Sequence, residues 1–257
     1  MSEIKPADLI DQSPNSRVKN ALNKAMSIYL TRLKTQMIEE GLEASFQMHL
    51  AGLLRDELEL LTIARDERFI VELEKNMGDE KKNYVDISIE FYEKGKPCKQ
   101  YLIELKFKKA SQAAENQNVI NSFIDIYNLE QLAIHNEKIE ACYFIFLTDY
   151  ESYTKETDKG TRKEFTMHNG AKIQTNKIYT DESKTAKNSL EKYKNGLKFS
   201  NNYQIEYKKI EAHDKSYWFF LLEIKNKAWL MAEILKLSLN DFFTKKFLNF
   251  ALLPLAF

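Results

Sequence analysis

Apolar residues between positions 17 and 64 recur every three to four residues, which is the period of an amphipathic helix. They are Leu22, Met26, Tyr29, Leu30, Leu33, Leu42, Phe46, Leu50, Leu53 and Leu54. Gly41 stands between the two groups of apolar positions. Because glycine punctuates helical patterns, we predict two helices here. Residues 1–16 are predicted to form a loose arm before them.

Further along the chain, apolar residues recur at every second position, and no longer at every third or fourth. Residues 85–91 alternate between apolar and polar types, which is typical of a strand. The runs 69–74 and 101–107 predict strands before and after it. The sequence Glu-Lys-Gly-Lys-Pro at positions 93–97 has the residue types of a tight turn. Three consecutive strands are therefore expected, with a hairpin joining the second to the third.

Residues 110–135 have helical spacing, and the continuous apolar run 141–148 predicts a strand covered on both faces. A strand, a helix and a further strand in this order form a crossover unit, so strands 101–107 and 141–148 should be parallel. The polar, Lys-rich stretch 150–200 predicts only short turn-like pieces. Two more strands are expected at 202–209 and 217–224, and a helix at 228–239.

These elements predict an α/β fold, with a mixed central sheet flanked by helices and a C-terminal α+β elaboration. The 257 residues, of which 44% are apolar and 30% charged, are typical of a folded globular chain. We expect one domain over 1–257. Its core covers about residues 41–149, and the elaboration covers about residues 150–257.

The net charge of zero argues against a histone-like or tail-driven nucleic-acid binder. It leaves open an enzyme whose acidic site offsets a basic groove. Two cysteines and four scattered histidines support neither a disulfide framework nor a zinc site. Residues 1–15 lack a signal-peptide core, and no apolar run has the length of a membrane span. A cytoplasmic protein without a membrane segment is the expectation.

Three charged residues lie inside the predicted strands. Asp86 stands between apolar neighbours, and Glu104 and Lys106 interrupt the apolar run 101–107. Charges with apolar neighbours on both faces are costly to bury. Glu104 and Lys106 share a strand face, and Asp86 lies beside Glu104 if the hairpin pairs them. Two adjacent carboxylates suit Mg²⁺, and a nearby ammonium suits a phosphate or an attacking water. The alternative is an exposed strand face whose charges pair with neighbours.

This pattern, within the order helix, three strands, helix, strand, resembles the PD-(D/E)XK nuclease superfamily, which includes many type II restriction endonucleases. The resemblance covers about residues 41–149, and Val85 stands where the motif nominally has proline. It implies that Asp86 and Glu104 hold the metal and that Lys106 joins them in catalysis. It also implies that Glu43 supports the metal. Glu43 can instead be a solvated charge on a Glu-rich helix.

Gln117 is a weaker match to a polar residue that family members often carry on the helix after the lysine, and it can equally be an ordinary helix residue. The resemblance implies a Mg²⁺-dependent endonuclease that hydrolyses double-stranded DNA, most specifically a homodimeric type II restriction enzyme. One alternative is a repair, recombination or phage nuclease of the same fold. Another, from a different class, is a non-catalytic DNA-binding or protein-interaction module.

Basic residues gather in the elaboration. Residues 155–198 contain eleven Lys and Arg against six Asp and Glu. Lysine and arginine beside Ser, Thr and Asn are typical of phosphate contacts, although a solvated loop has the same composition. The apolar end 247–257 predicts a buried segment or a dimer contact. The candidate DNA-binding residues are Lys155, Lys159, Arg162, Lys163, Lys172 and Lys177.

Overall fold

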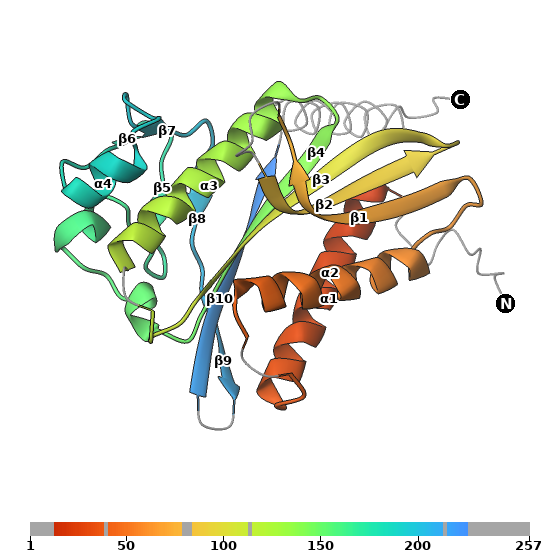
Figure 1. Ribbon diagram of the computed structural model, residues 1–257, viewed down its shortest axis with the longest axis horizontal. Coiled ribbons are helices and arrows are strands. Elements are labelled where there is room, and N and C mark those ends of the chain that lie inside the picture. Colours follow the sequence, from red (N-terminus) through yellow and green to blue (C-terminus); the bar gives the residue numbers. More distant parts are fainter. Residues whose placement is uncertain (1–12, 39–40, 79–83, 113–114, 213–214, 226–257) are drawn as a thin grey trace, which may run out of the picture.

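The computed structural model describes residues 13–38, 41–78, 84–112, 115–212 and 215–225. Its centre is a six-stranded mixed sheet with the strand order β1-β2-β3-β4-β10-β9 (Figure 1). β3 and β4 are parallel, and every other neighbouring pair is antiparallel. The strands are β1 (Glu67–Asn76), β2 (Tyr84–Glu93), β3 (Lys96–Lys108), β4 (Ile139–Thr148), β9 (Lys208–Ala212) and β10 (Lys215–Lys225).

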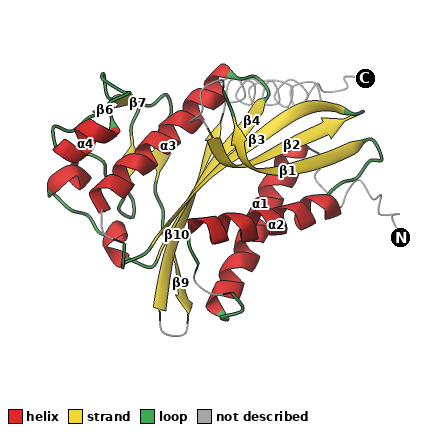
Figure 2. Cartoon of the chain, viewed as in Figure 1, coloured by secondary structure: helices red, strands yellow, loops and turns green. Residues whose placement is uncertain are grey.

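Three long helices cover the two faces of this sheet (Figure 2). α1 (Pro14–Lys34) and α2 (Glu43–Leu60) bury their apolar sides against one face, with Ile87, Ile103 and Ile145 of the strands. α3 (Glu115–His135) packs against the opposite face. Because side chains alternate along each strand, the two faces have separate apolar cores.

The large elements confirm the order predicted from the apolar periods. Helix α1 ends before residue 41 and helix α2 begins after it. Strands β3 and β4 are parallel and are joined by α3, which makes β3–α3–β4 a crossover unit. The predicted hairpin turn is also confirmed. Lys94 and Gly95 join β2 to β3 with positive φ angles of 51° and 75°. Two successive left-handed residues match the twist of the flanking strands, which is why this two-residue loop is tight.

The apolar side chains of residues 150–205 pack against α3, and they share one core with it. Phe123 of α3 lies 5.2 Å from Phe165, 5.0 Å from Tyr179 and 6.1 Å from Phe199, measured between ring centroids. The elements of this segment are short: η2 (Glu151–Thr154), η3 (Gly160–Lys163), β5 (Lys172–Ile173), β6 (Ile178–Tyr179), α4 (Lys184–Ser189), β7 (Leu197–Lys198) and β8 (Tyr203–Gln204).

Three details of the sequence prediction are wrong. Helix α1 begins at Pro14, inside the stretch 1–16 predicted to be a loose arm. The single strand expected at 202–209 is divided, because β8 pairs with β5 in a separate small sheet while β9 joins the central sheet. Ile205 between them is buried, and its N–H donates to Ala171 O at 2.9 Å. Helix α3 begins at Glu115 and not at residue 110. The helix expected at 228–239 and the apolar end 247–257 lie outside the described residues.

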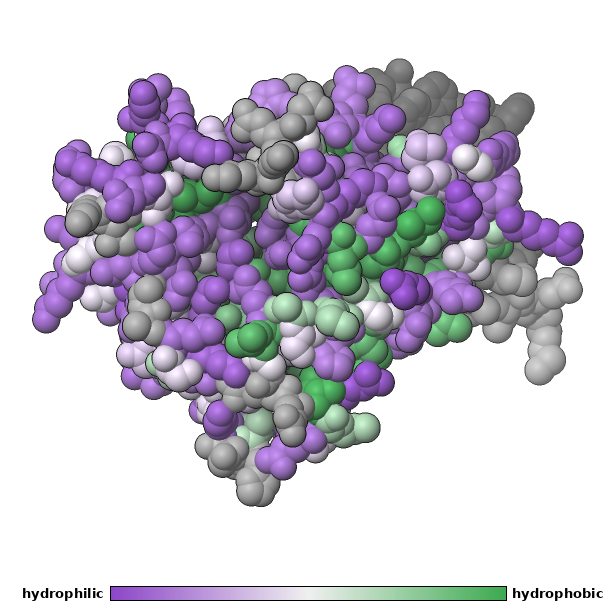
Figure 3. Space-filling view, in the orientation of Figure 1, coloured by the Kyte–Doolittle hydropathy of each residue, from purple (hydrophilic) through white to green (hydrophobic). Residues whose placement is uncertain are grey.

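The surface in Figure 3 is mostly hydrophilic, with hydrophobic side chains gathered over β1 and α2. Leu60 at the end of α2 is 72% exposed and Leu73 of β1 is 42% exposed. Across the described part of the chain, every helix is too short or too polar to cross a bilayer.

Candidate active site

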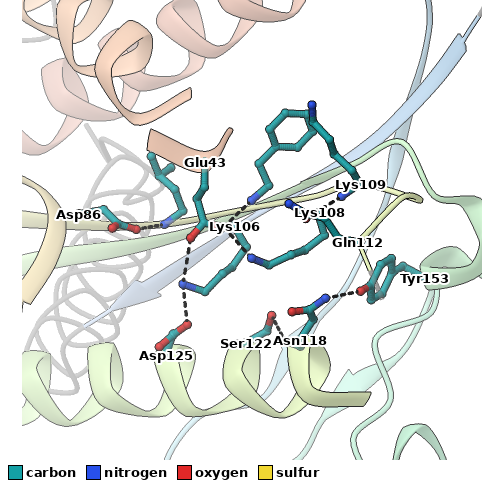
Figure 4. Close-up of polar contacts among 12 residues, drawn as sticks. Glu43, Asp86, Lys106, Lys108, Lys109, Gln112, Asn118, Ser122, Asp125 and Tyr153 are labelled. Carbon is teal, nitrogen blue, oxygen red and sulfur yellow. Dashed lines mark hydrogen bonds and ion pairs between the residues drawn. The ribbon is translucent and has the colours of Figure 1, made fainter. Parts of the chain in front are cut away.

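The β2–β3 hairpin brings Asp86 and Glu104 together. Ile87 pairs with Ile103, and Asp86 and Glu104 are the next residues along the two strands. The two carboxyl groups are close enough to share a hydrogen bond. Asp86 Oδ2 also accepts a hydrogen bond from the Leu105 backbone N–H at 2.7 Å, which fixes its direction (Figure 4). The predicted contact between the two acids is therefore present.

The surroundings of Glu104 favour its protonated form, because the nearby negative charges outweigh the one nearby positive charge. Burial raises the pKa of Glu104 well above its usual value, and the charges of Asp125 and Asp86 raise it further. Lys106 acts in the opposite direction but does not compensate. Two carboxyl groups this close repel each other when both are charged, which favours the protonated form of the buried Glu104. A cation placed between them would remove that cost.

Lys106 points from β3 toward α3, on the same side as Glu104. Its Nζ lies 3.0 Å from Asp125 Oδ2 and 3.7 Å from Glu43 Oε1 (Figure 4). Burial acts to lower the pKa of Lys106, but the neighbouring carboxylates of Asp125, Glu43, Glu104 and Asp86 outweigh it and raise the pKa above the usual value. Lys106 is therefore an ammonium at neutral pH.

Glu43 contacts the lysines and not the acid pair. It is the first residue of α2, and its Oε2 accepts hydrogen bonds from the Phe107 N–H at 3.0 Å and from Lys108 Nζ at 2.8 Å. Within the described ranges, no group of three or more His, Cys, Asp or Glu side chains is arranged to hold a metal ion. The set of Asp86, Glu104 and Glu43 implied by the resemblance is thus not assembled.

A pocket of about 260 Å³ lies between the start of α2, β3 and α3. Sequence reasoning missed the α3 residues that line it, among them Asp125. Its apolar sequence neighbours Ile124 and Ile126 gave no signal, because adjacent residues on a helix do not share a face. The lining residues are Glu43, Lys106, Lys108, Asn118, Asn121, Ile124 and Asp125.

Gln117 lies beside this pocket. Its Nε2 donates to Asn121 Oδ1 at 2.8 Å and to Ser189 Oγ of α4 at 2.5 Å. Gln117 also lines a larger groove of about 870 Å³ between the start of α3 and residues 157–162. It therefore connects the pocket to the elaboration without lining the pocket itself.

The predicted DNA-binding residues divide into paired and exposed side chains. Arg162 lies 2.7 Å from Glu115 Oε2 and donates to backbone carbonyls of the η2 region, so it holds the loop in place. Lys155 pairs with Glu151 at 2.8 Å and Lys177 pairs with Glu164 at 3.3 Å. The remaining three are exposed: Lys159, Lys163 and Lys172.

No family model, no curated protein and no solved structure matches the chain. The resemblance to the PD-(D/E)XK nucleases therefore stays a prediction. Its support comes from the residues that the fold brings together.

Proposed function

We propose that this chain is a Mg²⁺-dependent endodeoxyribonuclease of the PD-(D/E)XK type, and specifically a sequence-specific restriction enzyme. One observation carries the proposal: the carboxyl groups of Asp86 and Glu104 meet on the sheet face that also presents the ammonium of Lys106. The element order α2, β1, β2, β3, α3, β4 around them supports it.

The acid pair fits a magnesium ion. Its side-chain donors are carboxylate oxygens, which Mg²⁺ prefers, and proteins hold this ion through one or two carboxylates while it keeps several waters. Burial and the neighbouring carboxyl groups of Asp125 and Asp86 raise the pKa of Glu104, and a bound cation would act in the opposite direction. When bound, Mg²⁺ would polarise a phosphate oxygen and lower the pKa of a bound water.

The remaining work belongs to side chains of the protein. The Leu105 N–H keeps the Asp86 carboxylate aimed at Glu104. Lys106, held by Asp125, would place its charge beside the phosphate oxygens, where negative charge develops as water attacks phosphorus in line. The bond from phosphorus to the 3′ oxygen then breaks, which leaves a 5′-phosphate on the product.

Digestion of unmethylated plasmid in Mg²⁺, with Ca²⁺ as a parallel condition, tests this function. We expect Asp86→Asn, Glu104→Gln and Lys106→Met each to lower cleavage at least about a hundredfold, while duplex binding in Ca²⁺ persists. Glu93→Gln is the control, because it removes an exposed acid at the other end of β2, outside the site. Full cleavage by all three site variants would exclude the proposed centre.

The same assay separates the restriction enzyme from its alternatives. Discrete plasmid fragments support sequence-specific cleavage. Cleavage confined to forked oligonucleotides supports a repair or recombination nuclease. A non-catalytic module predicts no cleavage and no heat of Mg²⁺ binding in calorimetry, whereas the proposed enzyme predicts a binding signal that Asp86→Asn removes.

A further inference from the structure

The Glu43 carboxylate occupies a site built for an oxyanion. Its Oε2 accepts from the Phe107 N–H at 3.0 Å and from Lys108 Nζ at 2.8 Å, and its Oε1 lies 3.7 Å from Lys106 Nζ (Figure 4). The two lysine side chains are only 15% and 18% exposed. Two largely buried ammonium groups and a backbone donor around one carboxylate form a strong set of charge-assisted contacts.

The adjoining pocket of about 260 Å³ has room for an anion larger than a carboxylate. Asn118 and Asn121 of α3 line it opposite Lys106 and Lys108. Asn121 Oδ1 accepts a hydrogen bond from Gln117, which leaves the Asn121 amide nitrogen as the donor of that side chain. The pocket therefore adds amide groups to the donors that already surround Glu43.

Glu43 is the partner that can leave this cluster. Its side chain is 34% exposed, about twice the exposure of either lysine. The preceding residue, Leu42, is 66% exposed and provides no side-chain cap for α2. Lys106 has a second partner that does not depend on Glu43, because its Nζ lies 3.0 Å from Asp125 Oδ2. An incoming anion would thus meet the ammonium of Lys106 already held in place, and would replace Glu43 as the partner of Lys108.

We propose that Lys108, the Phe107 N–H and Lys106 form a phosphate-binding subsite, and that Glu43 is its resident counter-ion, displaced by a phosphate group. The phosphate is assigned to the DNA backbone on the strength of the proposed nuclease function; the oxyanion site itself does not depend on that function. Glu43 thereby gains a role different from the metal ligation that the resemblance implies.

Duplex binding without divalent cations tests the displacement. Glu43→Gln keeps an acceptor for the Phe107 N–H but removes the competing charge. We expect it to bind a short labelled duplex about tenfold more tightly than the wild type. We also expect the slope of log affinity against log salt to steepen by about one, because the subsite then carries one more net positive charge toward the DNA. Tighter binding is expected to vanish in Glu43→Gln/Lys108→Met.

Glu140→Gln is the matched control. It removes one carboxylate from another Lys–Glu pair between strands, in which Glu140 lies 3.0 Å from Lys99. If Glu43→Gln binds the duplex no more tightly than Glu140→Gln, the displacement is wrong. If Glu43→Gln instead weakens Mg²⁺ binding in calorimetry, Glu43 is a metal ligand and the proposal falls.

Inorganic phosphate provides a probe that needs no nuclease activity. In ¹⁵N-labelled wild type we expect phosphate to shift the Phe107 amide resonance saturably, and Lys108→Met to abolish that shift. If phosphate shifts the Phe107 resonance but the wild type cleaves no DNA, the phosphate subsite is supported and the nuclease function is wrong. The absence of any shift, in the wild type and in Glu43→Gln, would reject the subsite.

Discussion

At the scale of single residues, Lys106 has its position set by α3 as much as by its own strand. Asp125 Oδ2 lies 3.0 Å from its Nζ, and this ion pair is less exposed than most pairs on the surface. In the proposed reaction Asp125 is therefore a positioning residue, because it contacts the lysine and not the reacting atoms.

We expect Asp125→Asn to lower kcat about a hundredfold with little change in KM, because the lysine loses its direction while the other DNA contacts remain. Asp125→Glu, which restores the charge, should recover part of the loss. Steady-state cleavage of a short duplex measures both constants. A rise in KM with kcat unchanged would show that Asp125 serves binding instead.

A second prediction at this scale concerns Glu90 on β2. Burial alone would raise its pKa, but hydrogen bonds from Lys75 and Tyr92 outweigh burial and lower the pKa below the usual value. A lowered folded-state pKa gives stability that is present above the unfolded-state pKa and disappears as the pH falls. We expect Glu90→Gln to reduce the free energy of unfolding by about 1 kcal/mol at pH 7.

The difference should close as the pH falls through the lowered pKa of Glu90, because the wild-type carboxylate then takes up a proton. Urea unfolding of both proteins at neutral and at acid pH measures it. A gap that stays constant over this range would show that the ion pair does not carry the stability.

At the scale of elements, α3 joins the sheet to the elaboration through Glu130. This buried carboxylate accepts hydrogen bonds from Ser200 N at 2.7 Å, Asn201 N at 2.9 Å and Tyr203 Oη at 2.7 Å. Its charge is thus compensated by donors from a segment about seventy residues away in the sequence. Such fully satisfied groups are costly to disrupt.

Glu130→Gln places an amide N–H₂ against those donors and removes the charge that they solvate. We expect the free energy of unfolding to fall by about 3 kcal/mol, with amide exchange accelerated first around residues 197–204. Urea unfolding and hydrogen exchange measure the two effects. Glu137→Gln, on an acid just after α3, is the control. Equal stability of both variants would contradict this role.

The elements themselves show how far the sequence determines the fold. Apolar periods are sustained through residues 14–148, so the order of the large helices and strands could be predicted. In the elaboration the strand predicted at 217–224 is confirmed as β10, but strands of two residues such as β5 and β6 have no period to detect. The division of strand 202–209 had no glycine or proline to mark it.

The site follows the same rule. Asp86, Glu104 and Lys106 could be predicted because strand alternation fixes their face. Asp125 could not be assigned, since its contact with Lys106 depends on how α3 packs across the crossover. The placement of Glu43 between two lysines depends likewise on where α2 begins relative to β3.

At the scale of the whole molecule, the segment after β4 completes the sheet and the core on the α3 face. β10 pairs with β4 from Thr148 to Ala141, and Phe220 stacks on Phe146 with ring centroids 5.6 Å apart. Phe123 of α3 is fully buried by aromatic residues of the elaboration. Part of the burial of residues 41–149 therefore comes from residues that follow them in the chain.

Because residues before and after position 149 share one apolar core, we expect the whole chain to unfold cooperatively. A chain ending at Asp149 would leave β4 as an open apolar edge and would expose Phe123, Phe144 and Phe146. Exposed apolar strands of this kind associate with other chains. We expect the truncated chain to lack a sharp thermal transition, and the full chain to unfold in one transition with equal calorimetric and van't Hoff enthalpies. Cooperative melting of the truncated chain would instead make residues 1–149 an independent domain, with the elaboration as an addition to it.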